Sequence, residues 1–255
     1  MTEALAARTV NPVARLLAAA IIAAGLVLSL DWVSALTALI LEVGLFFAIG
    51  ARPRPVLIRS ALLVVAAAVT AVTILLYGQS SGAVHWHFLL ITVSDGSIAL
   101  ALATFLRVLA IALPSVILFA DVEPTELADG LGQVLRLPAR FVLGALAGLR
   151  LVNLLAEDWR YLGYARRARG VADHAPLRRV AGQAFALLVF AVRRGSKLAT
   201  AMEARGFGAH RTRSWARPSP FSGREFALIA AGFAIAATAT TVAVTTGNWN
   251  FIGHR

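Results

Sequence analysis

Two copies of one tripeptide are the residues most suited to binding chemistry in this sequence. Ala168-Arg169-Gly170 and Ala204-Arg205-Gly206 each close a long segment with helical character. Glycine ends a helix sharply because it adopts the left-handed conformation without steric cost, so the preceding arginine lies in the last turn. A guanidinium there presents a planar set of donors that fits a carboxylate on a partner. An arginine near a helix end also complements the helix dipole, but this accounts poorly for two successive copies.

These tripeptides require two long helices to position them. One helix is expected to follow Pro138 and to run to Arg169, and the other to run from near Pro176 to Arg205. Each has about 30 residues and is therefore about 45 Å long at 1.5 Å per residue. A shorter helix is expected before them, starting at Glu123-Pro124, because proline is favoured in the first turn.

Small residues recur at helical spacing within both long helices. Gly144 and Gly148 lie four residues apart in the first helix, as do Ser196 and Thr200 in the second, with Ala204 continuing the row. Small side chains let helix backbones approach closely in an apolar environment. The pattern predicts that the two helices cross or that they offer a smooth surface to another membrane protein. Ordinary packing of alanine-rich helices is the alternative.

The composition indicates a membrane protein. Hydrophobic residues make up 59% of the 255 residues and charged residues only 15%, against about 25% charged residues in soluble domains. Five segments reach the roughly 20 apolar residues that cross a bilayer. They are Val13–Leu30, Trp32–Gly50, Arg59–Tyr77, Ser97–Ala120 and Glu225–Thr246. We therefore expect an all-α membrane protein with about five transmembrane helices.

The basic residues predict the orientation of these spans, because Lys and Arg near span ends favour the cytoplasmic side. The Asp31 turn and the loop at residues 78–96 contain no Lys or Arg, and both are assigned to the outside. The N-terminus and the connection after the second span are assigned to the inside on account of five arginines. These are Arg8, Arg15, Arg52, Arg54 and Arg59.

Three regions follow from this topology. Residues 1–120 carry four spans, residues 121–225 form a cytoplasmic platform that contains the long helices, and residues 226–255 carry the last span and a short outer tail. The platform holds 17 of the 24 Lys and Arg residues. The apolar stretches Phe141–Leu149 and Val180–Val192 within it are too short to cross a bilayer. A rival interpretation inserts both as a hairpin and gives seven spans.

Two charged residues fall inside predicted spans. Glu42 lies near the middle of the second span and Arg107 well inside the fourth. A charge in the bilayer costs several kcal/mol, roughly, unless it is paired or hydrated, so both residues are candidate functional positions. We expect them to face protein, and a direct pair between them is one hypothesis.

Several segments together resemble a known family. The run from Asp121 to Gly130 (DVEPTELADG), then Ala165–Gly170 (ARRARG) and Ala199–Gly208 (ATAMEARGFG), are similar to the transmembrane T component of energy-coupling factor transporters. These are importers of vitamins and metal ions in the ABC class. The resemblance covers nearly the whole chain, including Asn11–Arg15, and is most specific over residues 121–210.

The resemblance implies a mechanism in which the long helices couple ATP hydrolysis to transport. Two cytoplasmic ATPase subunits would contact the helix tips, with Arg169 and Arg205 pairing with their acidic residues. The membrane-facing surfaces of the crossed helices would hold a substrate-binding S component. The chain would transmit force without an enzymatic reaction, a metal or a cofactor. The transported substrate, and whether the S component is dedicated or shared, do not follow from this sequence.

Other functions fit the sequence less well. The chain has no cysteine, which excludes thiolate sites. It also has no G-x-x-x-x-G-K-[ST] motif, which excludes a P-loop nucleotide-binding site. A secondary transporter with its own substrate site is the alternative, but it predicts matched halves with broken helices, whereas Pro114 is the one proline deep in a span. Nucleic-acid binding is not expected, because nine acidic residues are interleaved with the 17 bases of the platform.

Overall fold

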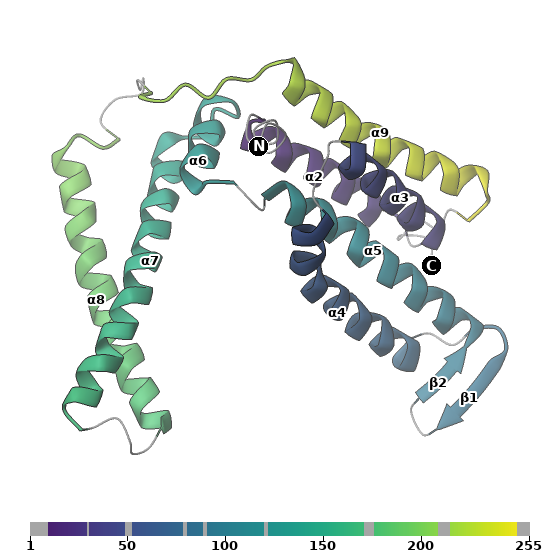
Figure 1. Cartoon of the computed structure of the whole chain (residues 1–255), viewed down its shortest axis with the longest axis horizontal. Helices are drawn as coiled ribbons and strands as arrows, with labels where there is room; N and C mark the ends of the chain where they lie inside the picture. Colours follow the sequence, from purple (N-terminus) through teal and green to yellow (C-terminus); the bar gives the residue numbers. More distant parts are fainter. Residues whose placement is uncertain are drawn as a thin grey trace. The chain divides into compact units, whose positions relative to one another are not determined.

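The computed structural model describes residues 10–29, 31–48, 53–78, 81–88, 91–119, 122–170, 176–208 and 215–248. These residues form eight helices and one two-stranded hairpin (Figure 1), which confirms the predicted all-α class of membrane protein. The elements are α2 (Pro12–Val27), α3 (Trp32–Ala48), α4 (Pro53–Tyr77), β1 (Val84–Phe88), β2 (Ile91–Ser94), α5 (Asp95–Phe119), α6 (Pro124–Gln133), α7 (Ala139–Ala168), α8 (Pro176–Ala204) and α9 (Gly223–Thr245).

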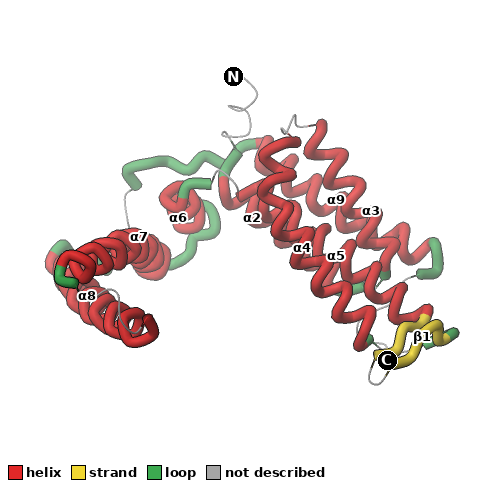
Figure 2. Tube along the Cα trace, turned by 60° about the horizontal axis from the view of Figure 1, so that its bottom comes forward, coloured by secondary structure: helices red, strands yellow, loops and turns green. Residues whose placement is uncertain are grey.

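The chain divides into two compact units. Residues 1–123 and 220–255 form the first, which we call the bundle unit, and residues 124–219 form the second, the crossed-helix unit. The bundle unit contains α2 to α5 and the hairpin. Its last helix, α9, packs against α2 and α3 although the whole crossed-helix unit separates it from them in the sequence. Figure 2 shows these helices of the bundle lying side by side.

The core of the bundle unit is built from small and branched apolar residues on four helices. Ile22 and Leu26 of α2, Ala38 of α3 and Ala110 of α5 form one buried cluster with two residues of α9, Ile235 and Ala239. Glycines bring α2 and α9 close together. A Cβ at Gly232 would lie 3.0 Å from the carbonyl oxygen of Ala18, and one at Gly25 would lie 2.9 Å from the Cβ of Ala236. Small residues therefore set the spacing of this helix pair.

The described helices match the predicted spans in part. Three long, apolar helices lie where the third, fourth and fifth spans were predicted, at Ile58–Tyr77, Asp95–Phe119 and Gly223–Thr245. The first two predicted spans are the shorter helices α2 and α3, of 16 and 17 residues. The predicted ends at Leu30, Gly50 and Ala120 lie outside the described residues, as do Arg8 and Arg52.

Helix α7 differs from the sequence expectation in one respect. Its 30 residues form a continuous helix that is, by length and composition, also apolar enough to cross a membrane. The sequence pattern predicted only the short apolar run Phe141–Leu149 here, because Arg150 interrupts it. One arginine does not cancel the apolar residues on both of its sides, so the whole first half of α7 is suited to an apolar environment.

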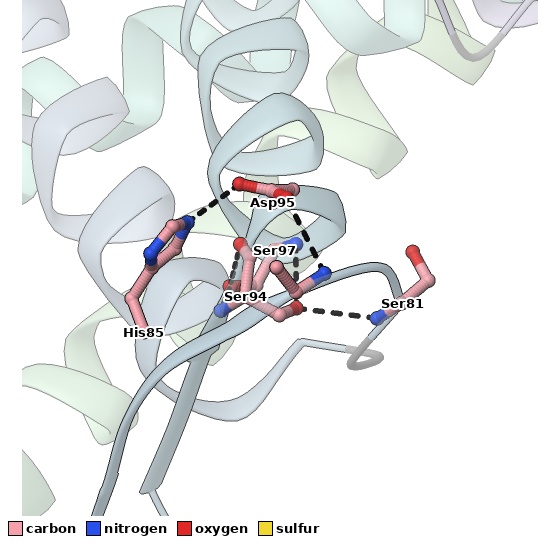
Figure 3. A network of polar contacts seen from close by, with 6 residues as sticks. Ser81, His85, Ser94, Asp95 and Ser97 are labelled. Atoms are coloured by element: carbon pink, nitrogen blue, oxygen red, sulfur yellow. Dashed lines mark hydrogen bonds and ion pairs between the residues drawn. The ribbon is translucent and has the colours of Figure 1, made fainter.

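The expected loop at residues 78–96 contains a β-hairpin. β1 and β2 pair antiparallel, with Val84 opposite Ser94 and a bulge between Val84 and Trp86. Its segments are rich in β-branched and aromatic residues, a composition that favours strands and that the sequence prediction did not include. The hairpin is tied to the start of α5 by side chains (Figure 3). His85 Nε2 donates to Asp95 Oδ1 at 2.6 Å, and Ser94 and Ser97 bond to each other's backbone N–H groups.

The crossed-helix unit consists of α6, α7, α8 and the segment that follows them. Gln133 at the end of α6 holds this segment. Its Nε2 donates to the carbonyl of Arg217 at 2.8 Å, and its Oε1 accepts from the Ser219 N–H at 2.8 Å. Gly132 lies against the ring of Trp215, with no room for a Cβ. The chain is therefore anchored beside α6 before it enters α9.

Candidate functional site

Both long helices end as their glycines predicted. α7 is capped at Arg169, and Gly170 follows with φ +67°. α8 ends at Ala204, and Gly206 has φ +76°. The Gly170 N–H donates to the carbonyl of Arg167 at 3.0 Å, and the Gly206 N–H to that of Glu203 at 2.9 Å. Left-handed glycines thus stop both helices one residue after the arginine.

The two arginines at these ends are accessible. Arg169 and Arg205 are both exposed, and neither guanidinium makes an ion pair or a side-chain hydrogen bond with any described residue. A charged fork of donors held at a helix tip keeps its full capacity to bind an anionic group of a partner. The geometry is therefore that of a contact site.

The two tips point to opposite ends of the helix pair. α7 and α8 run in opposite directions and cross each other (Figure 1). They have 30 and 29 residues, so each is roughly 45 Å long. Because each arginine follows the C-terminal end of its own helix, Arg169 and Arg205 lie far apart. Such a spacing suits two separate contact partners.

Polar side chains fasten the crossing of α7 and α8. Arg194 Nη1 donates to Asp158 Oδ2 at 2.7 Å, and a second, longer contact of 3.5 Å joins Nη2 to Oδ1. Gln183, only 5% exposed, donates to the carbonyl of Trp159 at 3.3 Å, and Arg166 donates to the carbonyl of Arg179 at 3.2 Å. These contacts join the C-terminal half of α7 to α8.

The predicted small residues do not mediate this crossing. A Cβ at Gly144 or Gly148 would meet no atom within 4 Å. The hydroxyls of Ser196 and Thr200 donate to carbonyls of their own helix, at 2.9 Å and 3.0 Å, and both residues are exposed. The expectation that these residues bring α7 and α8 together is therefore not met. Their role as a surface for another protein stays a prediction.

Glu42 and Arg107 are both in the bundle unit but do not bond to each other. Glu42 is 1% exposed, and neither of its carboxylate oxygens has a hydrogen-bond partner among the described residues. Nε and Nη2 of Arg107 are also buried without a partner there. The hypothesis of a direct pair thus finds no support in the geometry.

Sequence reasoning missed a polar clamp at the entry to α9, which we define by Asn11, Pro220, Ser222 and Glu225. Glu225 is 3% exposed and accepts hydrogen bonds from the backbone N–H groups of Asn11, at 3.1 Å, and Ser222, at 2.8 Å. Asn11 Nδ2 donates to the carbonyl of Pro220 at 3.1 Å. The clamp joins the start of α2 to the start of α9. The spacing Ser222-x-x-Glu225 is a capping-box signal that a sequence search can find.

The chain has several apolar helices that are long enough to cross a membrane, and it also carries a helix pair with exposed arginine tips. These features define a multi-pass membrane protein. Residues 5–214 match the family described as cobalt transport protein, CbiQ, and the chain belongs to this family. This match, with the relatives below, confirms the resemblance to the transmembrane component of energy-coupling factor transporters. The described residues contain no group of three His, Asp or Glu placed to hold a metal ion.

Curated proteins similar to this chain include two that are named energy-coupling factor transporter transmembrane protein EcfT. The one from Limosilactobacillus fermentum is 29% identical over 158 residues, which cover 55% of this chain and 59% of the relative. The one from Exiguobacterium sibiricum is 29% identical over 160 residues, covering 58% of this chain and 61% of the relative. The match thus spans about three fifths of the length of these relatives.

Proposed function

We propose that this chain is the coupling subunit of an energy-coupling factor importer. In this function it transmits the ATP-driven motion of two cytoplasmic ATPase subunits to a membrane-embedded S component that binds a vitamin or a transition-metal ion. The chain itself carries out no reaction. The family membership and the names of both relatives support this role.

The observation that carries the proposal is the pair of arginine tips. Two copies of one tripeptide end two antiparallel helices, each with an exposed arginine that has no partner among the described residues. Two equivalent contact points at opposite ends of one rigid element suit a pair of similar ATPases. Each arginine would form a bidentate contact with an acidic residue of one ATPase. The open surface near Gly144, Gly148, Ser196 and Thr200 would face the S component.

Rigidity explains how the crossed helices would transmit force. The hydrogen bonds of Gln183 and Arg166 and the ion pair of Asp158 with Arg194 fix the two helices to each other. A displacement of one tip by an ATPase therefore moves the whole pair, because α-helices of this length transmit a rigid-body motion with little internal change.

In this function the protein lies in the inner membrane. The crossed-helix unit and the N-terminus are on the cytoplasmic side. Because the chain has no cysteine, single-cysteine variants report each position without background. Cysteines at Ala168 and Ala204 should react with a membrane-impermeant maleimide only after the membrane is opened. A cysteine at Ser81, beside the hairpin, should react in intact cells and is the matched control. Labelling of Ala168→Cys from outside contradicts this topology.

Charge reversal tests the assigned contacts. Arg169→Glu and Arg205→Glu, made in the chain coexpressed with its genomic neighbours, should each reduce the amount of copurified ATPase about ten-fold or more. Arg160→Glu and Arg193→Glu change the same charge at exposed positions within α7 and α8, well before the arginine tips, and should leave copurification within about two-fold. Unchanged assembly and uptake in the Arg169 and Arg205 variants contradicts the proposal. Uptake by the chain without any ATPase supports the secondary transporter instead.

A further inference from the structure

A wide groove lies between the first half of α7 and the last part of α8. Its volume is about 1130 Å³, which exceeds the size of typical small-molecule pockets. Apolar side chains from both helices form much of its wall. They are Leu143, Leu146, Leu151 and Leu154 of α7 and Leu198 and Met202 of α8. The groove thus offers an apolar surface that neither helix covers.

All charged residues that line the groove are basic. They are Arg140, Arg150, Arg194 and Arg205, and no Asp or Glu is among the lining residues. Arg194 is bonded to Asp158, whereas the other three make no ion pair with any described residue. A concave apolar surface surrounded by unneutralised arginines is complementary to a molecule that combines an anionic group with an apolar chain.

We propose that this groove binds an anionic phospholipid of the cytoplasmic leaflet. Its acyl chains would lie along the leucines, and its phosphate would bind Arg140 and Arg150. The inference rests on the proposed function in one respect, namely that the crossed-helix unit lies at the cytoplasmic membrane surface. Basic pockets between apolar helices on this side of a membrane commonly bind acidic lipid headgroups.

The character of α7 favours a lipid over a protein helix as the occupant. α7 is one of the described helices apolar enough to lie within a membrane. Phe141 is 69% exposed and Val152 is 60% exposed, and neither lines the groove, so α7 presents apolar side chains outside it too. A helix with apolar side chains on several faces is suited to contact with lipid. Between α7 and α8, such a lipid would fill the open part of the crossing.

The test measures lipid binding by the purified, delipidated full-length chain. Native mass spectrometry would follow titration with phosphatidylglycerol and, separately, with phosphatidylcholine of the same acyl chains. The wild-type chain should retain phosphatidylglycerol in preference to phosphatidylcholine. The double variant Arg140→Gln/Arg150→Gln should bind phosphatidylglycerol about 30-fold more weakly, because each arginine contributes about 1 kcal/mol near an anionic headgroup. Arg160→Gln/Arg178→Gln removes two charges outside the groove and should change binding less than about two-fold.

A second variant separates binding in the groove from attraction to surface charge. Ala147→Trp keeps every arginine but fills part of the groove, so it should also weaken phosphatidylglycerol binding. The proposal is overturned if the two double arginine variants lose phosphatidylglycerol binding equally. It is also overturned if Ala147→Trp binds this lipid as well as the wild-type chain does. If the groove variants bind lipid normally but lose a copurified subunit, the groove is a protein contact and the lipid proposal is wrong.

The lipid proposal and the proposed function fail in distinguishable ways. Lipid binding is measured on the chain alone, whereas assembly is measured by copurification with the ATPases. A chain that assembles normally but shows no preference for phosphatidylglycerol disproves only the lipid site. A chain that binds phosphatidylglycerol but recruits no ATPase disproves only the coupling role.

Discussion

Gly25 and Gly232 of the bundle unit lie against a neighbouring helix, whereas Gly144 and Gly148 of the crossed-helix unit face open space. Gly25 and Gly232 allow α2 and α9 to approach until no Cβ would fit without a shift. In α7 a Cβ at either glycine meets nothing within 4 Å. The same residue type therefore serves internal packing at Gly25 and Gly232 and leaves an open surface at Gly144 and Gly148. A stripe of small residues indicates a helix face and does not identify what covers that face.

The largest expected effect follows from filling a packed glycine. Gly232→Leu places a side chain against the backbone of Ala18 and should lower the free energy of unfolding by about 2 kcal/mol or more. Gly148→Leu is the matched control in the open region, and it should be neutral or stabilising because leucine is a better helix former. Thermal unfolding in detergent measures both. Equal destabilisation by the two variants contradicts the contrast between the units.

A smaller effect is expected at the polar clamp. Glu225→Gln replaces one acceptor oxygen by a donor, so a buried backbone N–H of Asn11 or Ser222 loses its partner. The loss should destabilise the bundle unit by about 1–3 kcal/mol. Glu203→Gln in the crossed-helix unit alters an exposed carboxylate and should change the free energy of unfolding by less than about 0.5 kcal/mol. Chemical unfolding compares them, and equal values would mean that the clamp contributes nothing.

The smallest effect concerns the ion pair at the crossing. Asp158 and Arg194 are partly exposed, so a double-mutant cycle with Asp158→Asn and Arg194→Gln should give a coupling energy of about 1 kcal/mol or less. The coupling should fall further in high salt, because solvent screens exposed charges. A coupling well above this value that does not respond to salt would show that the pair is effectively buried. The crossed-helix unit would then resemble the bundle more than its surface suggests.

Local signals predicted the ends of the long helices well. Proline and glycine act through their own backbone, so the starts after Pro138 and at Pro176 and the stops before Gly170 and Gly206 could be read directly. The hairpin was missed for a different reason. A short strand pair between two apolar helices gives a weak periodic signal, which the apolar pattern of the neighbouring spans outweighs.

Contacts between distant residues could not be read from the sequence. Asn11 and Glu225 are separated by 214 positions, and nothing in either local sequence identifies the other. The same holds for the contact of Gly25 with Ala236 and for that of Gly232 with Ala18. At the arginine tips the sequence predicted the local geometry because each tip depends on one helix end. The position of one tip relative to the other depends on how α7 and α8 cross, and the sequence does not determine that crossing.

The return of α9 to the bundle has a consequence for biosynthesis. α2, α3 and α5 leave the ribosome before the crossed-helix unit does, while Ile235 and Gly232, which complete their core, follow it. The interior that α2, α3 and α5 form therefore stays incomplete while the crossed-helix unit is still being made. Closure of the bundle is a late event, and a chain truncated before residue 220 lacks the helix that seals it.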